Sequence, residues 1–249
     1  MIYGIILAGG SGTRVGGEVP KQYIEINGKP LLYYTLQAFE VSDVNQIVIV
    51  ADEAHLRFVV SEIVDKYGLQ KVIRVCTGGS ERFYSVYHGL HELSDQAGEE
   101  DLVLIHDGAR PFIRPEEINQ MISETKTYGA AIAAMPVKDT IKVSDEEGFV
   151  AGTTIRSQTW QIQTPQAFRF GLIKKAYDRA YQVQQTSGTA GASAGHANET
   201  APDPGKLFTD DSMVVEAVFP NQKIKLVPTS YGNIKITTPE DLEAAKTRL

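Results

Sequence analysis

Short runs of Ile, Val, Leu and Ala recur along the first half of the chain and alternate with segments of helical periodicity. Runs that are apolar on both faces are typical of parallel strands covered by helices on either side. Five such strands are predicted, at residues 2–7, 46–51, 72–76, 102–106 and 130–135. The later apolar run at 223–227 predicts one more strand near the end of the chain.

Between the strands, apolar residues follow the spacing of amphipathic helices. One helix is predicted from five residues that share a face: Leu56, Val59, Val60, Ile63 and Val64. A second covers 118–125 behind Pro115, which suits a first helical turn. Alternating strands and helices imply right-handed crossovers, so we expect an α/β fold: a three-layer α/β/α sandwich with a mostly parallel, Rossmann-like sheet. Ligands of such sheets bind beyond the carboxyl ends of the strands.

Two segments depart from this alternation within what we expect to be a single domain, residues 1–249. Residues 137–159 contain short β-like pieces around a polar turn, which favours a protruding β-hairpin arm. A helix is predicted from 170 to 185. Residues 186–206 follow it with no Ile, Leu, Val or Phe, so we expect a mobile insert without a core of its own. A last helix begins after Thr238, with Pro239 at its first position.

Composition narrows the function classes. The 249 residues carry 24 Lys plus Arg and 31 Asp plus Glu, a net charge of −7, which argues against a general nucleic-acid binder. No apolar run approaches the roughly 20 residues that span a bilayer, and no signal peptide is read at the start, so no membrane contact is expected. A single cysteine, Cys76, cannot form an internal disulfide, which favours a reducing compartment and a cytoplasmic protein.

The strongest chemical signal is the glycine-rich stretch at residues 7–14, directly after the first predicted strand. Three glycines, Gly9, Gly10 and Gly12, let backbone N–H groups converge on an oxyanion. A tight strand-to-helix turn alone would explain one or two of them. The dinucleotide and Walker fingerprints both fail at the positions that follow. Arg14 and Lys21 lie close behind instead, and two such cations suit the charge of a triphosphate.

Residues 7–14 together with Pro20-Lys21-Gln22 resemble the signature of sugar-phosphate nucleotidyltransferases. The later motifs resemble one branch of that superfamily, the 2-C-methyl-D-erythritol 4-phosphate cytidylyltransferases. These motifs stand in the order of that family: residues 78–82 with Ser85, 106–111, 136–140, Trp160 with 163–168, 209–211 and 233–237. The similarity covers nearly the whole chain, although the family usually has a short polar loop where this sequence has residues 186–206.

The resemblance implies transfer of CMP from CTP to 2-C-methyl-D-erythritol 4-phosphate, with release of pyrophosphate, in the non-mevalonate route to isoprenoid precursors. The chemistry is consistent with the residues present. A phosphate monoester has a second pKa of about 6, so the nucleophile is largely dianionic at neutral pH and needs no general base. The enzyme has to hold two anions together and stabilise charge on the α-phosphate and the leaving pyrophosphate.

Carried over position by position, the resemblance also implies roles for particular residues. The catalytic cations would be Arg14, Lys21 and Lys235. CTP would be bound by Ala8, Gly9, Gly10, Gly12, Gly79, Ser85 and Gly108. The polyol phosphate would be bound by Arg110, Thr140, Arg156 and Thr209. Asp107 would help hold Mg²⁺ or another divalent cation, although an aspartate that caps the end of a strand is an alternative. In this family the arm crosses to a second subunit and delivers the equivalents of Thr140 and Arg156, which implies a homodimer.

Two other functions stay open at this point. One is a related cytidylyltransferase that acts on ribitol 5-phosphate and shares the loop and the Thr-Pro-Gln run. Gly108, Ala109 and Arg110, and Arg156 four residues before Trp160, look more like the methylerythritol branch. The other is a nucleotide-binding regulatory protein of the same fold without turnover. Against it, the sequence keeps Arg14, Lys21, Asp107 and Lys235 in place. A zinc site at His88 and His91 is less favoured than an ordinary helix surface.

Overall fold

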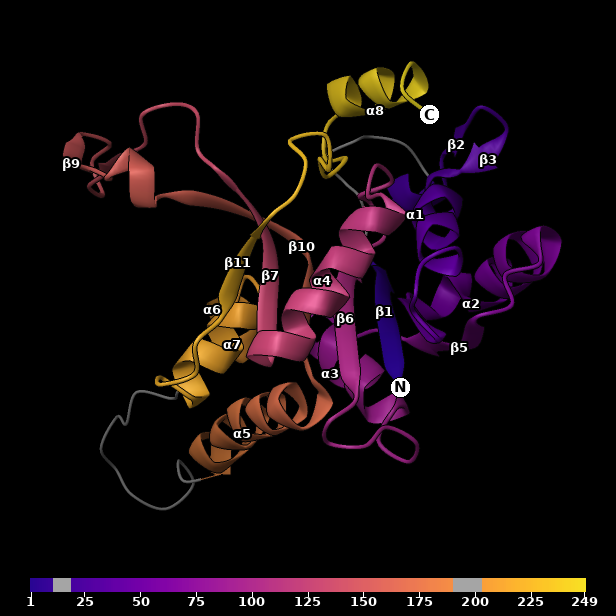
Figure 1. Ribbon diagram of the computed structural model, residues 1–249, viewed down its shortest axis with the longest axis horizontal. Helices are drawn as coiled ribbons and strands as arrows, with labels where there is room; N and C mark the ends of the chain where they lie inside the picture. The colour runs from indigo at the N-terminus through magenta and orange to yellow at the C-terminus, as the bar shows by residue number, and fades with distance from the viewer. Residues whose placement is uncertain (11–18, 190–202) are drawn as a thin grey trace.

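One mixed sheet of seven strands forms the centre of the molecule (Figure 1), and the computed structural model describes residues 1–10, 19–189 and 203–249 around it. The strands lie in the order β11-β7-β10-β6-β1-β4-β5, so the sheet takes strands from both ends of the chain. Their bounds are β1 (Ile2–Ala8), β4 (Gln46–Ala51), β5 (Val72–Thr77), β6 (Leu102–Asp107), β7 (Ala130–Pro136), β10 (Trp160–Arg169) and β11 (Lys225–Pro228).

Six of these strands run parallel, and β10 runs antiparallel between β6 and β7. The predicted α/β fold with a mostly parallel sheet is therefore confirmed, with the five predicted strands each within one residue of its observed ends. Strand β10 was not predicted from the sequence. Its register shifts between Ile162 and Gln166, which accommodates Pro165, a residue that cannot donate a hydrogen bond to a neighbouring strand.

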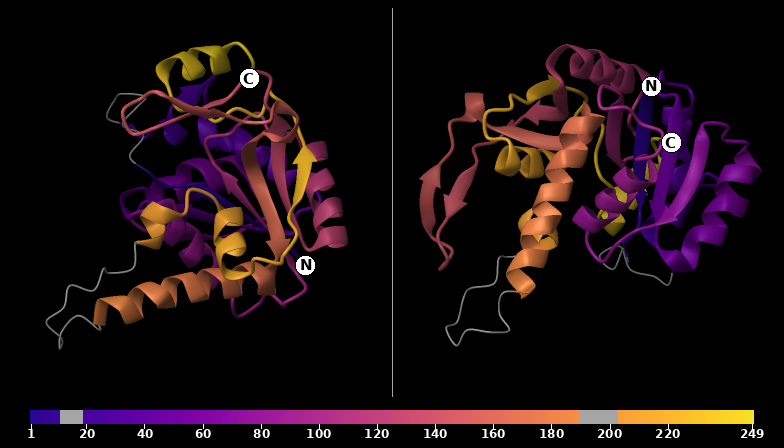
Figure 2. Two further views of the ribbon diagram at one scale, coloured as in Figure 1. Left: turned by 90° about the vertical axis from the view of Figure 1, so that its left-hand side faces the viewer. Right: turned by 90° about the horizontal axis from the view of Figure 1, so that it is seen from below.

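Helices cover both faces of the sheet and create its two hydrophobic layers (Figure 2). On one face α1 (Leu31–Glu40), α4 (Pro115–Tyr128) and the helical segment after β4 pack against the sheet. On the other face lie α3 (Arg82–Glu92), α5 (Phe170–Thr189) and α7 (Asp211–Val218). Successive side chains along each strand point to opposite faces, so each strand contributes to both hydrophobic layers. In β1, for example, Ile5 packs in one layer and Ile6 in the other.

The predicted helix of residues 56–64 is irregular. It consists of η2 (Glu53–His55), α2 (Leu56–Phe58) and a π-helical segment, η3 (Val59–Asp65). Val59 and Ile63 are buried as predicted, but Val60 is 40% exposed. The wider π turn changes the angle between successive side chains, so the face expected from α-helical spacing is not kept.

The remaining elements lie outside the central sheet. They are η1 (Lys21–Tyr23), β2 (Glu25–Ile26), β3 (Lys29–Pro30), β8 (Lys142–Ser144), β9 (Val150–Thr153), η4 (Arg156–Gln158), α6 (Pro204–Leu207) and α8 (Pro239–Lys246). Strands β8 and β9 pair with each other in a separate two-stranded sheet, which extends to one side of the molecule (Figure 1). Helix α8 begins at a capping box formed by Thr238 and Asp241, as the sequence predicts for its start.

The ends of the predicted insert differ from its expected bounds. Helix α5 continues through Thr189, and α6 begins at Pro204, which is buried. The Tyr84 hydroxyl donates a 2.6 Å hydrogen bond to Asp203, so the last residues of the range 186–206 contact α3. Residues 190–202 lie outside the described part of the chain. Among the described helices, none combines the length and the hydropathy needed to cross a membrane.

Candidate active site

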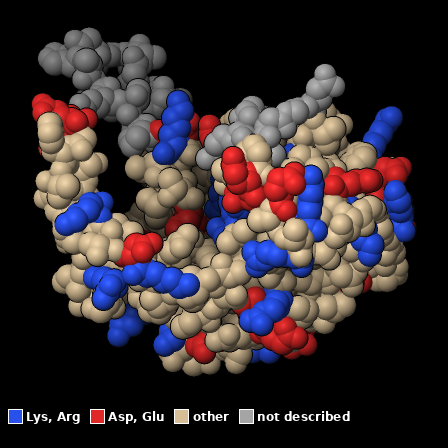
Figure 3. Space-filling model, turned by 90° about the horizontal axis from the view of Figure 1, so that it is seen from above, with Lys and Arg blue, Asp and Glu red and all other residues tan. Residues whose placement is uncertain are grey.

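A cavity of about 360 Å³ opens at the carboxyl ends of β1 and β6, the edge where ligands of open α/β sheets bind. Seven of the predicted site residues line it: Gly9, Gly10, Lys21, Gly79, Ser85, Asp107 and Lys235. Seven further residues line it that were given no role from the sequence: Leu7, Gln22, Ser80, Glu81, Arg82, Ala109 and Thr237. Figure 3 looks onto this end of the molecule and shows basic and acidic side chains interspersed there, with the hairpin standing clear of the body.

The start of the glycine-rich loop forms one wall of the cavity. Gly10 has a φ of 102°, a left-handed backbone conformation that favours glycine, and its N–H donates to Oδ1 of Asp52 at 3.3 Å. Buried Gln22 donates through Nε2 to the carbonyl of Ala8 at 2.7 Å and to that of Gly10 at 3.4 Å. The Pro-Lys-Gln motif therefore fixes the loop with its glutamine while Lys21 lines the cavity. Gly12 and Arg14 lie outside the described residues.

The opposite wall is the turn that leads into α3. The N–H of Gly79 donates to Oγ of Ser85 at 3.1 Å, so the turn closes on the first turn of the helix. A Cβ at Gly79 would lie 2.2 Å from Cβ of Tyr84 and 3.1 Å from its carbonyl carbon. Only glycine fits this close approach, which places the backbone of residues 79–82 along the cavity.

Three basic side chains surround Asp107 at the end of β6. Lys235 Nζ lies 3.0 Å from Oδ2 and Arg110 Nε lies 3.3 Å from the same oxygen, while Arg82 Nε lies 3.5 Å from Oδ1. Burial alone would raise the pKa of the carboxyl, but the charges of Lys235, Arg82 and Arg110 outweigh it and hold that pKa well below its usual range. Asp107 is therefore ionised throughout the physiological pH range.

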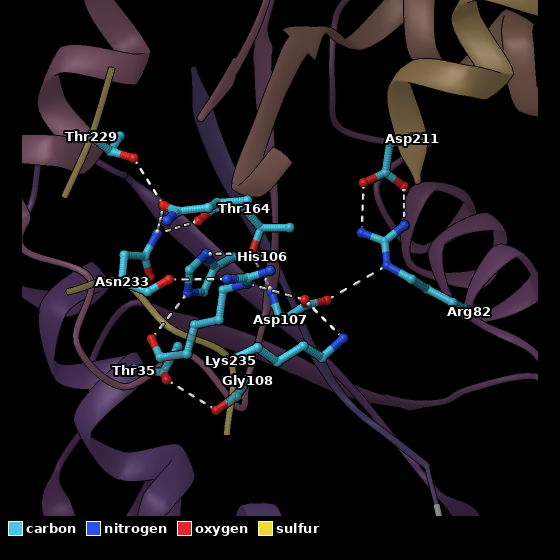
Figure 4. A network of polar contacts seen from close by, with 12 residues as sticks. Thr35, Arg82, His106, Asp107, Gly108, Thr164, Asp211, Thr229, Asn233 and Lys235 are labelled. Atoms are coloured by element: carbon cyan, nitrogen blue, oxygen red, sulfur yellow. Dashed lines mark hydrogen bonds and ion pairs between the residues drawn. The ribbon is translucent and has the colours of Figure 1, made fainter. Parts of the chain in front are cut away.

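Arg82 is the main site residue that the sequence analysis left without a role. Its guanidinium bridges Asp107 and the fully buried Asp211, with both Nη atoms 2.7 Å from the Asp211 carboxylate (Figure 4). Burial would lower the pKa of Arg82, but the charge and hydrogen bonds of Asp211 outweigh it and raise the pKa further. The sequence contains a signal for both residues, because Arg82 is the last residue of the motif at 78–82 and Asp211 is the last residue of the motif at 209–211.

A buried polar network supports the other side of Asp107. Thr164 accepts a hydrogen bond from the N–H of Asp107 at 3.1 Å, and Asn233 donates to the carbonyl of Thr164 at 2.9 Å. Arg110 donates through Nη1 to the carbonyl of Asn233 at 2.9 Å. The motifs at 106–111, 163–168 and 233–237 therefore meet at one point, from three separate parts of the chain (Figure 4).

Six described residues of the predicted site lie outside the cavity lining: Ala8, Gly108, Arg110, Thr140, Arg156 and Thr209. Ala8 and Gly108 use their carbonyls within the fold, accepting from Gln22 and from the hydroxyl of Thr35. Thr209 is exposed and its hydroxyl contacts the sulfur of Met213. Thr140 and Arg156 are exposed on the 137–159 segment. Of the predicted polyol-phosphate residues only Arg110 approaches the cavity, through its contact with Asp107.

A magnesium ion at this cavity would have to take part of its coordination from substrate phosphates. The described residues contain no group of three or more His, Cys, Asp or Glu side chains that could hold a metal by themselves. Mg²⁺, however, is commonly bound by one or two carboxylates together with phosphate oxygens and water, and Asp107 would supply one carboxylate.

The structure gives no support to a zinc site at His88 and His91. His91 contacts Asp178 and His88 contacts the carbonyl of Thr77, so the two rings have separate partners.

Comparison with known proteins points to one family. Residues 2–197 match the family described as "IspD: 2-C-methyl-D-erythritol 4-phosphate cytidylyltransferase". A relative of that name from Lachnospira eligens is 44% identical over 242 residues, covering 97% of this chain and 96% of the relative. A relative of the same name from Lachnoclostridium phytofermentans is 42% identical over 238 residues, covering 96% and 91%.

Solved structures agree with these relatives. The crystal structure of 4-diphosphocytidyl-2C-methyl-D-erythritol synthase from Anaerococcus prevotii aligns with a TM-score of 0.78 and 31% identity, covering 99% of this chain and 95% of that one. A 2-C-methyl-D-erythritol 4-phosphate cytidylyltransferase from Francisella tularensis aligns with a TM-score of 0.75 and 29% identity, covering the whole of both chains. The similarity therefore extends from the first strand to the last helix.

Proposed function

This chain belongs to the 2-C-methyl-D-erythritol 4-phosphate cytidylyltransferase family, and we propose that the cavity beside Asp107 is the place where it joins CTP to the polyol phosphate. The enzyme is a cytidylyltransferase of isoprenoid precursor synthesis: it transfers CMP from CTP to 2-C-methyl-D-erythritol 4-phosphate and releases pyrophosphate. The observation that carries the proposed site is the cluster of Lys21, Arg82 and Lys235 around a cavity walled by glycine backbone.

The reaction requires charge neutralisation more than proton transfer. A phosphate oxygen of the polyol phosphate attacks the α-phosphorus of CTP, and the bond to the pyrophosphate oxygen breaks. Negative charge grows on the α-phosphate and the leaving group in the transition state, where fixed cations and N–H donors lower its energy. Lys21 and Lys235 line the cavity and are positioned for this role. Arg14 is assigned the same role by the family motif and lies outside the described residues.

The two walls of the cavity suit recognition of the nucleotide. Backbone groups near Gly9, Gly10 and Gly79 are close enough to the cavity to contact a ligand without intervening side chains. The donors and acceptors of a peptide backbone match the amino and carbonyl groups of cytosine. Ser85 holds the Gly79 turn in shape by accepting its N–H. Asp107 would hold Mg²⁺ against the triphosphate, and the ion would neutralise phosphate charge there.

A homodimer would complete the site with residues from the hairpin segment. Thr140 and Arg156 are exposed outside the cavity of their own chain, which supports their delivery to a second subunit. Apolar side chains are also exposed on this segment: Val143 by 51%, Ile155 by 63% and Phe149 by 67%. A cluster of exposed apolar residues on a projecting hairpin is typical of an interaction surface. We therefore propose that the hairpins of two copies contact each other's subunit.

The proposed function is tested by measuring pyrophosphate release from CTP and Mg²⁺ with each polyol phosphate in turn. We expect release with 2-C-methyl-D-erythritol 4-phosphate and only background release with ribitol 5-phosphate or without an acceptor. A preference for ribitol 5-phosphate would assign the substrate to the related branch, and no release with either acceptor would favour the regulatory alternative. Omitting the metal tests the ion: undiminished release in chelator would remove Asp107 from its proposed role.

A further inference from the structure

Arg82 connects two carboxylates that lie far apart in the sequence. Its two Nη atoms donate to both oxygens of Asp211, each at 2.7 Å, while its Nε faces Oδ1 of Asp107 at 3.5 Å. A guanidinium whose two Nη atoms both donate to one carboxylate has a fixed plane and direction. The pairing with Asp211 therefore determines where Nε of Arg82 points, which is toward Asp107 at the cavity (Figure 4).

Asp211 is itself held rigidly. It is fully buried at the first position of α7, and the Tyr177 hydroxyl of α5 donates to its Oδ1 at 2.6 Å. The ring of Tyr177 stacks on that of Phe83 in α3 at a centroid distance of 4.7 Å. Three helices thus meet at this carboxylate, and its position is set by the packing of that layer rather than by solvent-exposed chain.

Lys235, another cation of Asp107, is held differently. Lys235 comes from the chain segment before α8, and its side chain is 38% exposed, whereas that of Asp107 is 10% exposed. A lysine side chain of this kind rotates easily toward a new anion, such as a phosphate in the cavity. Arg82 cannot do so without leaving the buried Asp211 carboxylate with no positive charge beside it, which is strongly unfavourable. Arg82 is therefore fixed by Asp211, and Arg110 is held by the carbonyl of Asn233, whereas Lys235 is able to turn to a ligand.

We propose that Asp211 is a positioning residue for the reaction: by holding Arg82 in place, it keeps the Asp107 carboxylate oriented while Lys235 turns to a substrate phosphate. This inference rests on the proposed role of Asp107 in the site. Asp211 touches no substrate and acts through Arg82. The same pairing keeps the guanidinium of Arg82 from turning toward an incoming phosphate, because that rotation would break both hydrogen bonds to Asp211.

The first test is Asp211→Asn, assayed by pyrophosphate release with saturating CTP. Loss of an outer partner of a ligating group typically lowers activity about 10- to 100-fold, and we expect a fall of that size in kcat with little change in KM for CTP. Asp178→Asn is the matched control, since it removes a carboxylate partner of Lys174 on the same layer of helices. Normal kcat in a folded Asp211→Asn enzyme would overturn the proposal.

A second variant separates positioning from folding. Arg82→Met, Asp211→Leu and Tyr177→Phe together replace the buried charges and their hydroxyl partner by apolar groups, which restores stability in many buried ion pairs. We expect a melting temperature near that of the wild type, with kcat still at least about tenfold lower. Recovery of both stability and kcat would show that the pair only supports the fold, which would refute the inference even if Asp211→Asn alone fails to fold.

A double-mutant cycle with Asp107→Asn tests whether Asp211 acts through Asp107. Residues in one network give non-additive effects, so Asp211→Asn should cost little further activity once Asp107 has lost its charge. A full additional loss of about tenfold in that background would show that Asp211 acts by another route. Wild-type turnover in Asp107→Asn alone would instead refute the proposed role of Asp107. That outcome is distinct from a result that refutes only the positioning role of Asp211.

Discussion

Oγ1 of Thr164 lies 3.0 Å from Nδ1 of His106, in the buried layer directly beneath Asp107. The other ring nitrogen, Nε2, lies 3.4 Å from the carbonyl of Arg110, which can only accept, so Nε2 carries the proton. Nδ1 then accepts from the Thr164 hydroxyl, whose oxygen in turn accepts the N–H of Asp107. This order of donors requires a neutral imidazole and fixes the end of β6, where the Asp107 carboxylate lies.

We therefore expect His106 to remain neutral down to low pH. Burial lowers the pKa of His106 to about 3, although the charge of Asp107 opposes the shift. In the unfolded chain its pKa is about 6.5, so the unfolded state binds a proton first as the pH falls. The stabilisation is complete above about pH 6.5 and is lost between there and about pH 3, at up to about 1.4 kcal/mol per pH unit.

NMR titration and urea unfolding check this expectation. The ring signals of His106 should not shift between pH 8 and about 5. The free energy of unfolding of the wild type should fall more steeply with decreasing pH than that of His106→Gln. A midpoint near 6.5 for His106 itself would contradict the neutral network.

The parts of the fold that the sequence predicted are those whose residues follow a local rule. Apolar runs such as Leu102 to His106 identified the parallel strands because both faces of each strand are buried. Strand β10 follows no such rule. Its centre contains Gln163, Thr164 and Gln166, which are buried through specific partners, including Thr229 and the N–H of Ser212. Those partners lie more than 40 residues away, so periodicity along the strand could not reveal it.

For the candidate site, too, local sequence patterns predicted only the residues that act through their own segment of chain. Glycine-rich motifs identified the cavity walls, since Gly9, Gly10 and Gly79 act through local backbone geometry. The pairing of Arg82 with Asp211 spans 129 residues and depends on how α3 and α7 pack, which no spacing rule encodes. Thr140 and Arg156 likewise lie on an exposed segment outside the cavity of their own chain, and no spacing rule relates them to it.

Gly79→Ala tests the wall formed by the turn before α3. An added Cβ would lie 2.2 Å from Cβ of Tyr84, and the nearby backbone of α3 cannot yield easily. Overpacking of this kind costs roughly 1–3 kcal/mol, and the displaced turn would also narrow the cavity. We expect a lower melting temperature and a raised KM for CTP. Gly98→Ala is the control, because its Cβ would meet its nearest neighbour at an ordinary 3.7 Å. Equal melting temperatures and equal KM values for CTP in the two variants would contradict the steric argument.

Lys21→Ala tests the cation at the cavity wall. Loss of a charge that acts mainly in the transition state lowers kcat by about 10²- to 10³-fold with smaller effects on stability. Pyrophosphate release gives kcat, and circular dichroism with a thermal melt verifies the fold. Lys175→Ala is the matched control: it removes a surface lysine paired with Glu99, outside the cavity lining. Near-normal turnover of Lys21→Ala would exclude it from the catalytic role.

Mixed dimers of Lys21→Ala and Arg156→Ala test whether the hairpin segment acts on a second subunit. If each site combines Lys21 of one subunit with Arg156 of the other, one site of every mixed dimer receives both defects and the other receives neither. Random pairing makes half of the dimers mixed, so co-expression should restore about a quarter of wild-type activity although each variant alone is nearly inactive.

The alternative arrangement gives a different result. If Lys21 and Arg156 serve a site within one chain, each site of a mixed dimer carries one defect, and co-expression restores nothing. Tagging the two variants differently and isolating the mixed dimer sharpens the measurement, because its expected activity is then about half that of the wild type. A doubly substituted chain paired with wild type is the control: its mixed dimer separates one defect into each site and should be nearly inactive if the segment acts across the dimer.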